Sequence, residues 1–359
     1  MDFVADIPDP EACSTRILDL TGYRFSPEVA GDLWVQILQH KWLLSEKLGR
    51  DVGNKVACID FIENTEAMGK DLREAETVQV LKDLGATRVD RSGWDTISDS
   101  QPPKQLVDKR IILPLTEVEL ARKHGVIPPR TIIFFGPPGT GKTHFVRGIA
   151  GILQWWYVEV SPSDLMAEGE DRLGTNLKRL MEKAGTLDEV VLFIDEFEEI
   201  AGNRDGASRI DKSITNEFLK QVPRLKRSRG KILLVCATNY IRQLDAALLR
   251  PGRFDCIIPV GALDDQSRRT VFEHYLSQTN RGEVDVDLII SLIPFFTPAD
   301  IEYLFQKVTQ RAFERELTLG KDYRLDTEIF LHAIPRIRPT LTTEIVTEFE
   351  KDCAEFTRY

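Results

Sequence analysis

Two kinds of hydrophobic pattern run along this chain, and they predict different elements. Short apolar runs at residues 131–135, 190–194 and 232–236 predict strands buried on both faces, and residues 156–160 predict a further strand. After them, apolar residues recur three or four positions apart, which predicts helices at residues 144–153, 268–276, 285–292 and 298–315. Strands that alternate with helices favour a parallel sheet covered by helices.

The first 90 residues carry helical patterns without strand signals. Ser26 and Pro27 are typical of a helix start, and Gly49 is typical of its end. Two more helices are predicted at residues 56–62 and 72–84. We interpret residues 1–90 as a small helical N-terminal domain whose first 20 residues are loosely attached. The polar stretch at residues 86–103 is interpreted as a linker.

Composition and charge narrow the class of protein. The chain is 42 % hydrophobic and 29 % charged, and no apolar run approaches the ~18 residues of a membrane-spanning helix. The acidic N-terminus lacks the features of a signal peptide. Five scattered cysteines predict reduced thiols and a cytoplasmic location. The net charge is −10, with −7 of it in residues 1–90, which argues against nucleic acid as a partner.

A glycine-rich loop lies between the strand at residues 131–135 and the helix that follows. It consists of Gly136, Pro137, Pro138, Gly139, Thr140, Gly141, Lys142 and Thr143, and it fits the pattern G-x-x-x-x-G-K-[ST]. In such loops the backbone N–H groups and the helix N-terminus surround a phosphate. Lys142 would reach the β- and γ-phosphates, and Thr143 would place its hydroxyl on Mg²⁺. The loop therefore predicts binding of a nucleoside triphosphate with Mg²⁺.

Two carboxylates follow the strand at residues 190–194. Asp195 and Glu196 come at its carboxyl end, where open α/β sheets bind ligands. With a phosphate loop some fifty residues earlier, Asp195 is predicted to hold Mg²⁺, through water. Glu196 is predicted to polarise the attacking water as a general base.

From Trp94 onward the chain resembles the main clade of AAA ATPases within the AAA+ superfamily, which includes katanin, the proteasomal ATPases and the FtsH-type proteases. The phosphate loop, Asp195-Glu196, Thr238-Asn239 and residues 244–255 carry the resemblance in the family's order. It implies that Ile97 and Ala299 contact the adenine of ATP, and that Asn239 orients the hydrolytic water. It further implies that Arg250 and Arg253 are arginine fingers on the neighbouring subunit's nucleotide.

The resemblance also implies an α/β fold in three parts. These are the N-terminal helical domain at residues 1–90, a P-loop NTPase core with a parallel sheet of order 5-1-4-3-2 at residues 91–261, and a helical lid at residues 262–359. The implied assembly is a homo-oligomeric ring, a hexamer. It would hydrolyse ATP to remodel a protein client, which we expect to dock on the N-terminal domain.

One loop departs from the family. Residues 166–172 stand where the family has an aromatic pore loop, but Gly169 takes the aromatic position and the loop holds three acidic residues. We therefore predict a remodelling ATPase that does not thread its client processively. Two alternatives remain open, namely a scaffold that binds ATP with little turnover and an AAA+ machine that acts on nucleic acid.

Overall fold

The computed structural model describes residues 9–23, 25–64, 77–169, 172–202, 209–227, 230–320 and 322–359. The chain divides into two compact units, Met1–Leu84 and Gly85–Tyr359, and each is considered by itself. Across these described ranges, no helix combines the length and the apolar character needed to span a membrane.

The first unit is helical, as its sequence predicts. Its elements are α1 (Pro10–Thr21), α2 (Pro27–Leu48), α3 (Gly53–Asn64) and a helix at residues 77–83. Gly49 ends α2, as predicted, and it has the left-handed conformation that favours glycine. The prediction that the first 20 residues are loosely attached is wrong for α1, because Cys13 and Ile17 are fully buried in a core with Trp34. Residues 72–76 of the helix predicted at residues 72–84 lie outside the described residues.

A six-stranded sheet forms the centre of the second unit. Its strands are β1 (Thr87–Arg88), β2 (Thr131–Phe135), β3 (Trp156–Val160), β4 (Val190–Ile194), β5 (Ile232–Thr238) and β6 (Cys256–Pro259), in the order β1-β3-β4-β5-β2-β6. Numbered among themselves, the five parallel strands β2 to β6 have the predicted order 5-1-4-3-2. The sheet differs from the predicted one in one detail, because a short additional strand, β1, pairs antiparallel with β3 at the edge of the sheet.

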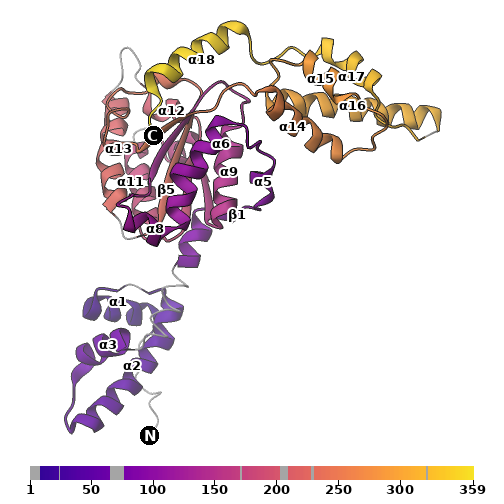
Figure 1. Ribbon diagram of the computed structural model, residues 1–359. Coiled ribbons are helices and arrows are strands. Elements are labelled where there is room, and N and C mark those ends of the chain that lie inside the picture. The colour runs from indigo at the N-terminus through magenta and orange to yellow at the C-terminus, as the bar shows by residue number, and fades with distance from the viewer. Residues whose placement is uncertain are drawn as a thin grey trace. The chain divides into compact units, whose positions relative to one another are not determined.

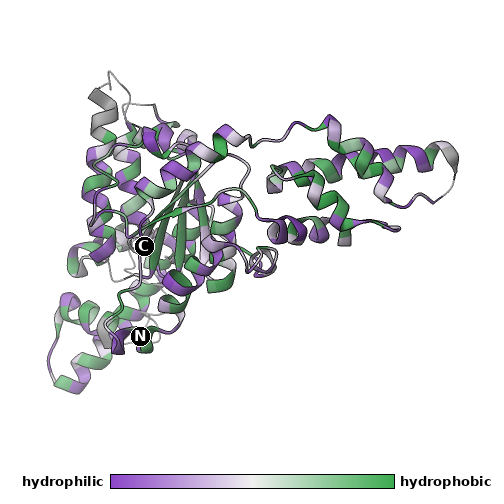
Figure 2. Ribbon diagram, turned by 45° about the horizontal axis from the view of Figure 1, so that its top comes forward, coloured by the Kyte–Doolittle hydropathy of each residue, from purple (hydrophilic) through white to green (hydrophobic). Residues whose placement is uncertain are grey.

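Helices cover both faces of this sheet (Figure 1). Helices α6 (Pro102–Val107) and α9 (Lys142–Leu153) lie on one face, and α11 (Leu173–Ala184) and α13 (Arg209–Arg227) lie on the other. The strands are hydrophobic along their length, whereas the helices alternate between hydrophobic and hydrophilic residues (Figure 2). In the core, Phe134 of β2 packs on Phe145 of α9 with ring centroids 6.0 Å apart. The apolar strands thus hold α9, and the loop before it, in a fixed place.

The stretch interpreted as a linker is part of the folded unit. It contains β1 and α5 (Ser92–Asp95), and the Trp94 side chain is only 4 % exposed. A Cβ atom at Gly148 of α9 would lie 2.7 Å from the Trp94 ring, so this close approach requires glycine. The linker prediction is wrong because a polar stretch with a single large aromatic anchor gives no periodic signal.

A second core is built around three aromatic rings by α14 (Asp265–Ser277), α15 (Val286–Leu292), α16 (Pro298–Leu319) and α17 (Thr327–Ala333). Helix α18 (Thr343–Phe356) follows them along the chain. Phe272, Phe305 and Phe330 pack together with centroids 4.8–5.4 Å apart. Helix α18 returns to the sheet, where Phe349 packs on Phe135 of β2. The division of the second unit at residue 261 stays a prediction.

Short elements complete the second unit. They are η2 (Asp108–Ile112), α7 (Leu113–Thr116), α8 (Val118–Lys123), α10 (Pro162–Met166), α12 (Glu198–Ala201), η4 (Ile241–Gln243) and η5 (Ile334–Arg336).

Candidate nucleotide-binding site

The glycine-rich loop lies at the carboxyl end of β2 and leads into α9. Gly139 and Gly141 have φ angles of 77° and 94°, in the left-handed region that favours glycine. A Cβ atom at Gly139 would lie 2.9 Å from the Thr297 hydroxyl oxygen, so a larger residue would collide with the start of α16. The Thr140 hydroxyl donates to the Pro137 carbonyl at 2.9 Å and holds the turn closed. The loop therefore has the shape that lets backbone N–H groups face a phosphate.

Lys142 is 7 % exposed, and its ammonium group points into this loop. It donates to the carbonyls of Gly136 and Pro137 at 2.8 and 2.9 Å and to Oδ1 of Asn239 at 2.7 Å. Burial lowers the pKa of Lys142 to about 8, although nearby carboxylates oppose the shift. A bound phosphate would supply the anionic partner that this buried ammonium group needs.

A hydroxyl and a carboxylate meet beside the lysine. The Thr143 hydroxyl donates to Oδ2 of Asp195 at 3.0 Å, and Oδ1 of Asp195 accepts the N–H of Glu196 at 2.9 Å. Mg²⁺ prefers oxygen ligands and is commonly held by one or two protein groups together with substrate phosphates. The described residues contain no cluster of three or more His, Cys, Asp or Glu that could hold a metal alone. Thr143 and Asp195 thus fit a Mg²⁺ ion that arrives with a nucleotide.

Glu196 lies at the mouth of the cleft with an exposed side chain. Its φ of 48° is unusual for a residue with a Cβ atom, and such strain is often concentrated at functional sites. The negative charge of Glu199 raises the pKa of Glu196, and partial burial, Asp195 and Glu198 add to the effect. A raised pKa makes a carboxylate a better proton acceptor, which suits a general base.

Asn239 connects the lysine to a carboxylate that sequence reasoning missed. Its side-chain oxygen accepts the hydrogen bond from Lys142, and its backbone N–H donates to Oε1 of Glu198 at 3.1 Å. Oε2 of Glu198 is buried, with no hydrogen-bond partner in the described part of the chain. Glu198 thereby adds negative charge close to the ammonium group of Lys142. In the sequence, Glu198 is marked only by its position two residues after Glu196. Acidic residues spaced in this way are common, so the position alone does not identify a site residue.

The loop opens onto a cleft of about 470 Å³. Both residues expected to contact a base, Ile97 and Ala299, line it, together with Lys142, Asp195, Glu196 and Asn239. The lining also includes residues that sequence reasoning did not select, among them Gln101, His144, His274, Tyr275 and Glu302. His144 forms a 2.7 Å hydrogen bond with the Thr96 hydroxyl, and burial lowers its pKa. The cleft is lined by residues from both cores of the second unit.

The two arginines predicted to be fingers do not line this cleft. Arg250 is exposed, and Arg253 is half-buried, in the segment that joins η4 to β6. The Arg253 guanidinium donates to the Leu219 carbonyl of α13 at 2.9 Å. Within one chain, therefore, neither arginine joins the other predicted site residues.

Comparisons with known proteins show what this chain resembles. The family described as ATPase family associated with various cellular activities (AAA) matches residues 132–262. The chain is 27 % identical over 286 residues to a cell division cycle protein 48 homolog of Archaeoglobus fulgidus, which covers 75 % of this chain and 39 % of that protein. It is 31 % identical over 198 residues to a proteasome-activating nucleotidase of Methanoculleus marisnigri, which covers 54 % of this chain and 48 % of that protein.

Among solved structures, the crystal structure of the FIGL-1 AAA domain matches with a TM-score of 0.65 at 21 % identity, over 76 % of this chain and 92 % of that one. At this identity the match shows the fold alone. The chain spans between about a third and a half of the length of the first curated relatives it matches.

Proposed function

We propose that this chain is an ATPase of the AAA family, which hydrolyses MgATP to remodel a protein partner. The match of residues 132–262 to the AAA family supports the proposal. One observation carries the hydrolytic part of the proposal. A buried lysine, a hydroxyl–carboxylate pair and an exposed glutamate converge on one cleft, namely Lys142, Thr143 with Asp195, and Glu196. These are the groups that phosphoryl transfer to water needs.

Each group has a distinct task in this proposal. Lys142 and the loop N–H groups bind the β- and γ-phosphates of ATP, and Ile97 and Ala299 flank the base. Thr143 and Asp195 hold Mg²⁺, which supplies charge neutralisation on the phosphate oxygens when it is bound. Glu196 takes a proton from water at its carboxylate, and Asn239 positions that water. The contact between Lys142 and Asn239 supports this arrangement, because it keeps the amide next to the phosphate-binding group.

We infer that the working form is a head-to-tail ring of copies of this chain, a hexamer. Arg250 and Arg253 lie outside the cleft of their own chain, so a guanidinium from this segment would act on the nucleotide of a neighbouring copy. A head-to-tail interface closes into a ring when its rotation allows. Mixing Arg250→Ala subunits with Lys142→Ala subunits should restore part of the activity that each variant lacks. Full activity of a verified monomer would contradict the ring.

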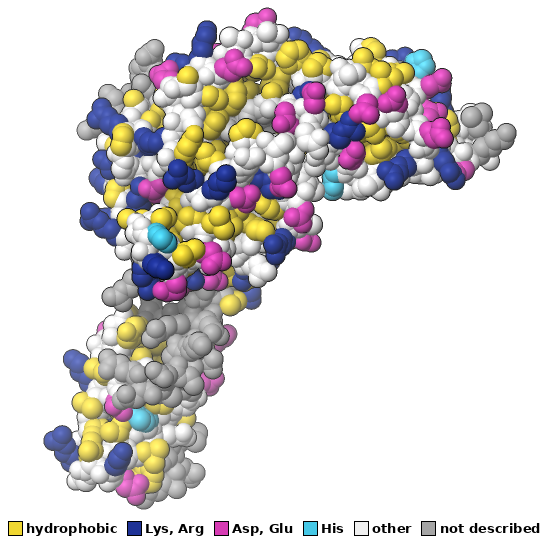
Figure 3. Space-filling model, viewed as in Figure 1, with side chains coloured by type: hydrophobic (Ala, Val, Ile, Leu, Met, Phe, Trp, Pro, Cys, Tyr) yellow, Lys and Arg dark blue, Asp and Glu magenta, His cyan; other side chains and the backbone are white. Residues whose placement is uncertain are grey.

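The remodelling target is proposed to be a protein in the cytoplasm, docked on the N-terminal domain. The relatives named for cell division and for proteasome activation support a protein client, and the five scattered cysteines support a reducing compartment. On the face shown in Figure 3, Lys and Arg side chains are interspersed with Asp and Glu. Such mixed charge is unlike the basic footprint of nucleic-acid-binding proteins. An assembly scaffold is disfavoured because Glu196 lies at the cleft.

We further propose that the ring does not thread its client processively. Within the described part of the loop at residues 166–172, no aromatic side chain is present, and Glu170 and Asp171 lie outside that part. Glu168 is engaged in ion pairs with Arg172 and Arg179, each at 3.4 Å. Hydrated, paired charges give little grip on an apolar chain. Robust ATP-driven unfolding of a marginally stable reporter protein, unaffected by Glu168→Gln, would overturn this part.

A steady-state ATPase assay with three variants tests the hydrolytic proposal. Lys142→Ala should abolish binding of a fluorescent ATP analogue. Glu196→Gln should keep that binding and slow turnover by about 10²–10⁴-fold, the usual effect of removing a general base. Glu182→Gln is the matched control, because Glu182 is exposed on α11 and does not line the cleft, so this variant should keep the wild-type turnover. Turnover of Glu196→Gln at the wild-type rate would refute the assignment of the base.

A further inference from the structure

Helix α13 contains a proline, and one arginine compensates for it. Pro223 has no N–H, so it donates nothing to the carbonyl of Leu219, four residues earlier. The Arg253 guanidinium donates to that same carbonyl at 2.9 Å. A backbone carbonyl deprived of its helical partner thus receives a charged donor from another segment.

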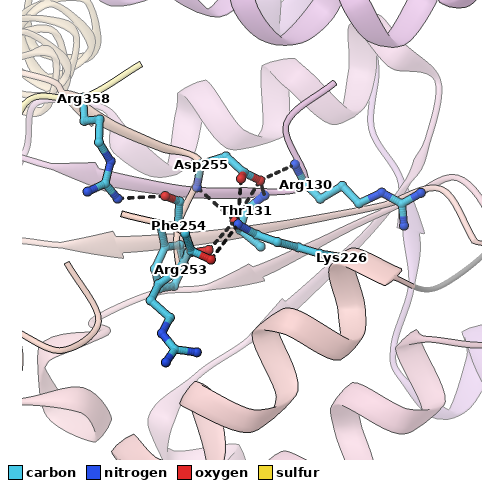
Figure 4. Close-up of polar contacts among 8 residues, drawn as sticks. Arg130, Thr131, Lys226, Arg253, Phe254, Asp255 and Arg358 are labelled. Atoms are coloured by element: carbon cyan, nitrogen blue, oxygen red, sulfur yellow. Dashed lines mark hydrogen bonds and ion pairs between the residues drawn. The ribbon is translucent and has the colours of Figure 1, made fainter. Parts of the chain in front are cut away.

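Further contacts fix the backbone on both sides of Arg253. Lys226, one turn after Pro223, contacts the Gly252 carbonyl at 3.4 Å and the Asp255 carboxylate at 2.6 Å. Arg358 donates to the carbonyls of Leu249 and Phe254 at 2.7 and 2.8 Å. Figure 4 shows Lys226 and Arg358 converging on this segment.

Asp255 ties the segment to the sheet. Its carboxylate accepts the backbone N–H groups of Arg130 and Thr131 at 2.9 and 3.1 Å, at the start of β2 (Figure 4). The Thr131 hydroxyl also donates to it at 3.0 Å. Residues 249–255 are therefore held by α13, by β2 and by Arg358, and this support leaves little freedom to move.

Arg250 differs from Arg253 in this rigid segment. Its side chain is exposed, and among the described residues its guanidinium makes no hydrogen bond or ion pair. It can reach a second molecule without breaking a contact. Arg253 could do so only by leaving the partly buried Leu219 carbonyl without this donor, which lowers stability.

We propose that the two arginines have different roles. Arg250 supplies the guanidinium that neutralises phosphoryl charge on the nucleotide of a neighbouring copy. Arg253 is a positioning residue, which anchors the segment through the carbonyl that Pro223 leaves free. The division of roles rests on the proposed ATPase function and refines it.

Conservative substitutions separate the two roles in the full-length chain. Arg250→Lys should lower kcat at least about 100-fold, because a lysine lacks the planar fork that binds phosphate oxygens. Arg253→Lys should lower kcat by less than about tenfold, because an ammonium group can still donate to Leu219. Arg253→Met, which has no donor, should lower both kcat and the melting temperature. Arg224→Met, an exposed arginine next to Pro223, is the control and should change neither.

A double-mutant cycle with Pro223→Ala tests the contact itself. This substitution returns an N–H to the helix, which can donate to the Leu219 carbonyl in place of Arg253. Arg253→Met should therefore lower the melting temperature by about 2–6 °C in the wild-type background and by much less in the Pro223→Ala background.

Two results would overturn the inference, and a third separates it from the proposed function. Equal loss of kcat in Arg250→Lys and Arg253→Lys would make both residues fingers. An equal melting shift from Arg253→Met in both backgrounds would remove the anchoring role. If Glu196→Gln leaves turnover unchanged, the ATPase proposal and the role of Arg250 both fail, while the melting cycle still decides whether Arg253 is anchored by Leu219.

Discussion

Raising the pH should weaken ATP binding through one side chain, Lys142. The pKa of Lys142 is lowered to about 8 by burial, against an ordinary value of 10.5. Only the ammonium form attracts the phosphates, and bound phosphates raise its pKa again because they favour the charged form. Binding above pH 8 must therefore take up a proton, and the affinity falls as the pH rises.

The size of the effect follows from the protonated fraction. With a pKa of about 8, Lys142 is about 90 % protonated at pH 7 and about 3 % at pH 9.5. If the complex keeps the lysine charged, the affinity should fall about 30-fold across this range, or about 2 kcal/mol. Burial lowers the pKa of His144 below 6.5, and the pKa of Tyr275 is raised above 10, so these two cleft residues change little in charge over the range.

Isothermal titration of ATP and Mg²⁺ into the Glu196→Gln variant, which should bind without turnover, measures this dependence. Buffers with different ionisation enthalpies should report the uptake of up to one proton at pH 9. Lys142→Arg is the matched control, because a guanidinium stays charged throughout, so its weaker binding should not vary with pH. A flat profile for Lys142, or the same slope in Lys142→Arg, would refute the reasoning.

Three further predictions concern the metal pair and the support of the sheet. Thr143→Val keeps the shape but removes the hydroxyl beside Asp195, so ATP affinity measured with and without EDTA should become nearly independent of Mg²⁺; an unchanged Mg²⁺ dependence would argue against this ligand. Asp255→Ala should destabilise the second unit by about 2–4 kcal/mol in urea unfolding, because several donors lose their acceptor; a change below about 0.5 kcal/mol would contradict that account. Phe349→Ala should lower the free energy of unfolding by about 2 kcal/mol, because this half-buried ring packs on Phe135. An unchanged unfolding midpoint would show that α18 contributes little to the stability of the second unit.

The parts of the site that sequence predicted are those whose chemistry is local. The loop from Gly136 to Thr143 carries its own signature, and Asp195 and Glu196 follow directly from a buried strand. Ile97 and Ala299 came from the family resemblance, and the structure places both in the cleft. In the loop and at Asp195 and Glu196 a short stretch of residues determines the local conformation, while the roles of these residues stay predictions.

The parts that sequence missed depend on contacts between distant segments. Trp94 packs a polar stretch of the chain onto α9, and a single buried aromatic residue leaves no periodic pattern in the sequence. The contact between Arg253 and Leu219 joins residues 34 positions apart, so the sequence showed two equivalent arginines where the fold gives them different surroundings. Helix α1 was missed because its apolar positions, such as Cys13 and Ile17, are few among polar ones.

The two outer strands of the sheet have a consequence for aggregation. A free strand edge offers unpaired N–H and C=O groups to which another chain can add. Here β1 pairs with β3 at one edge, and at the other the backbone of Arg358 exchanges two hydrogen bonds with Ile257 of β6. With both edges partly capped, copies of this chain would associate through side chains and not by extending one sheet. Removal of residues 357–359 would uncover the backbone of Ile257 and leave the second unit prone to edge-to-edge association.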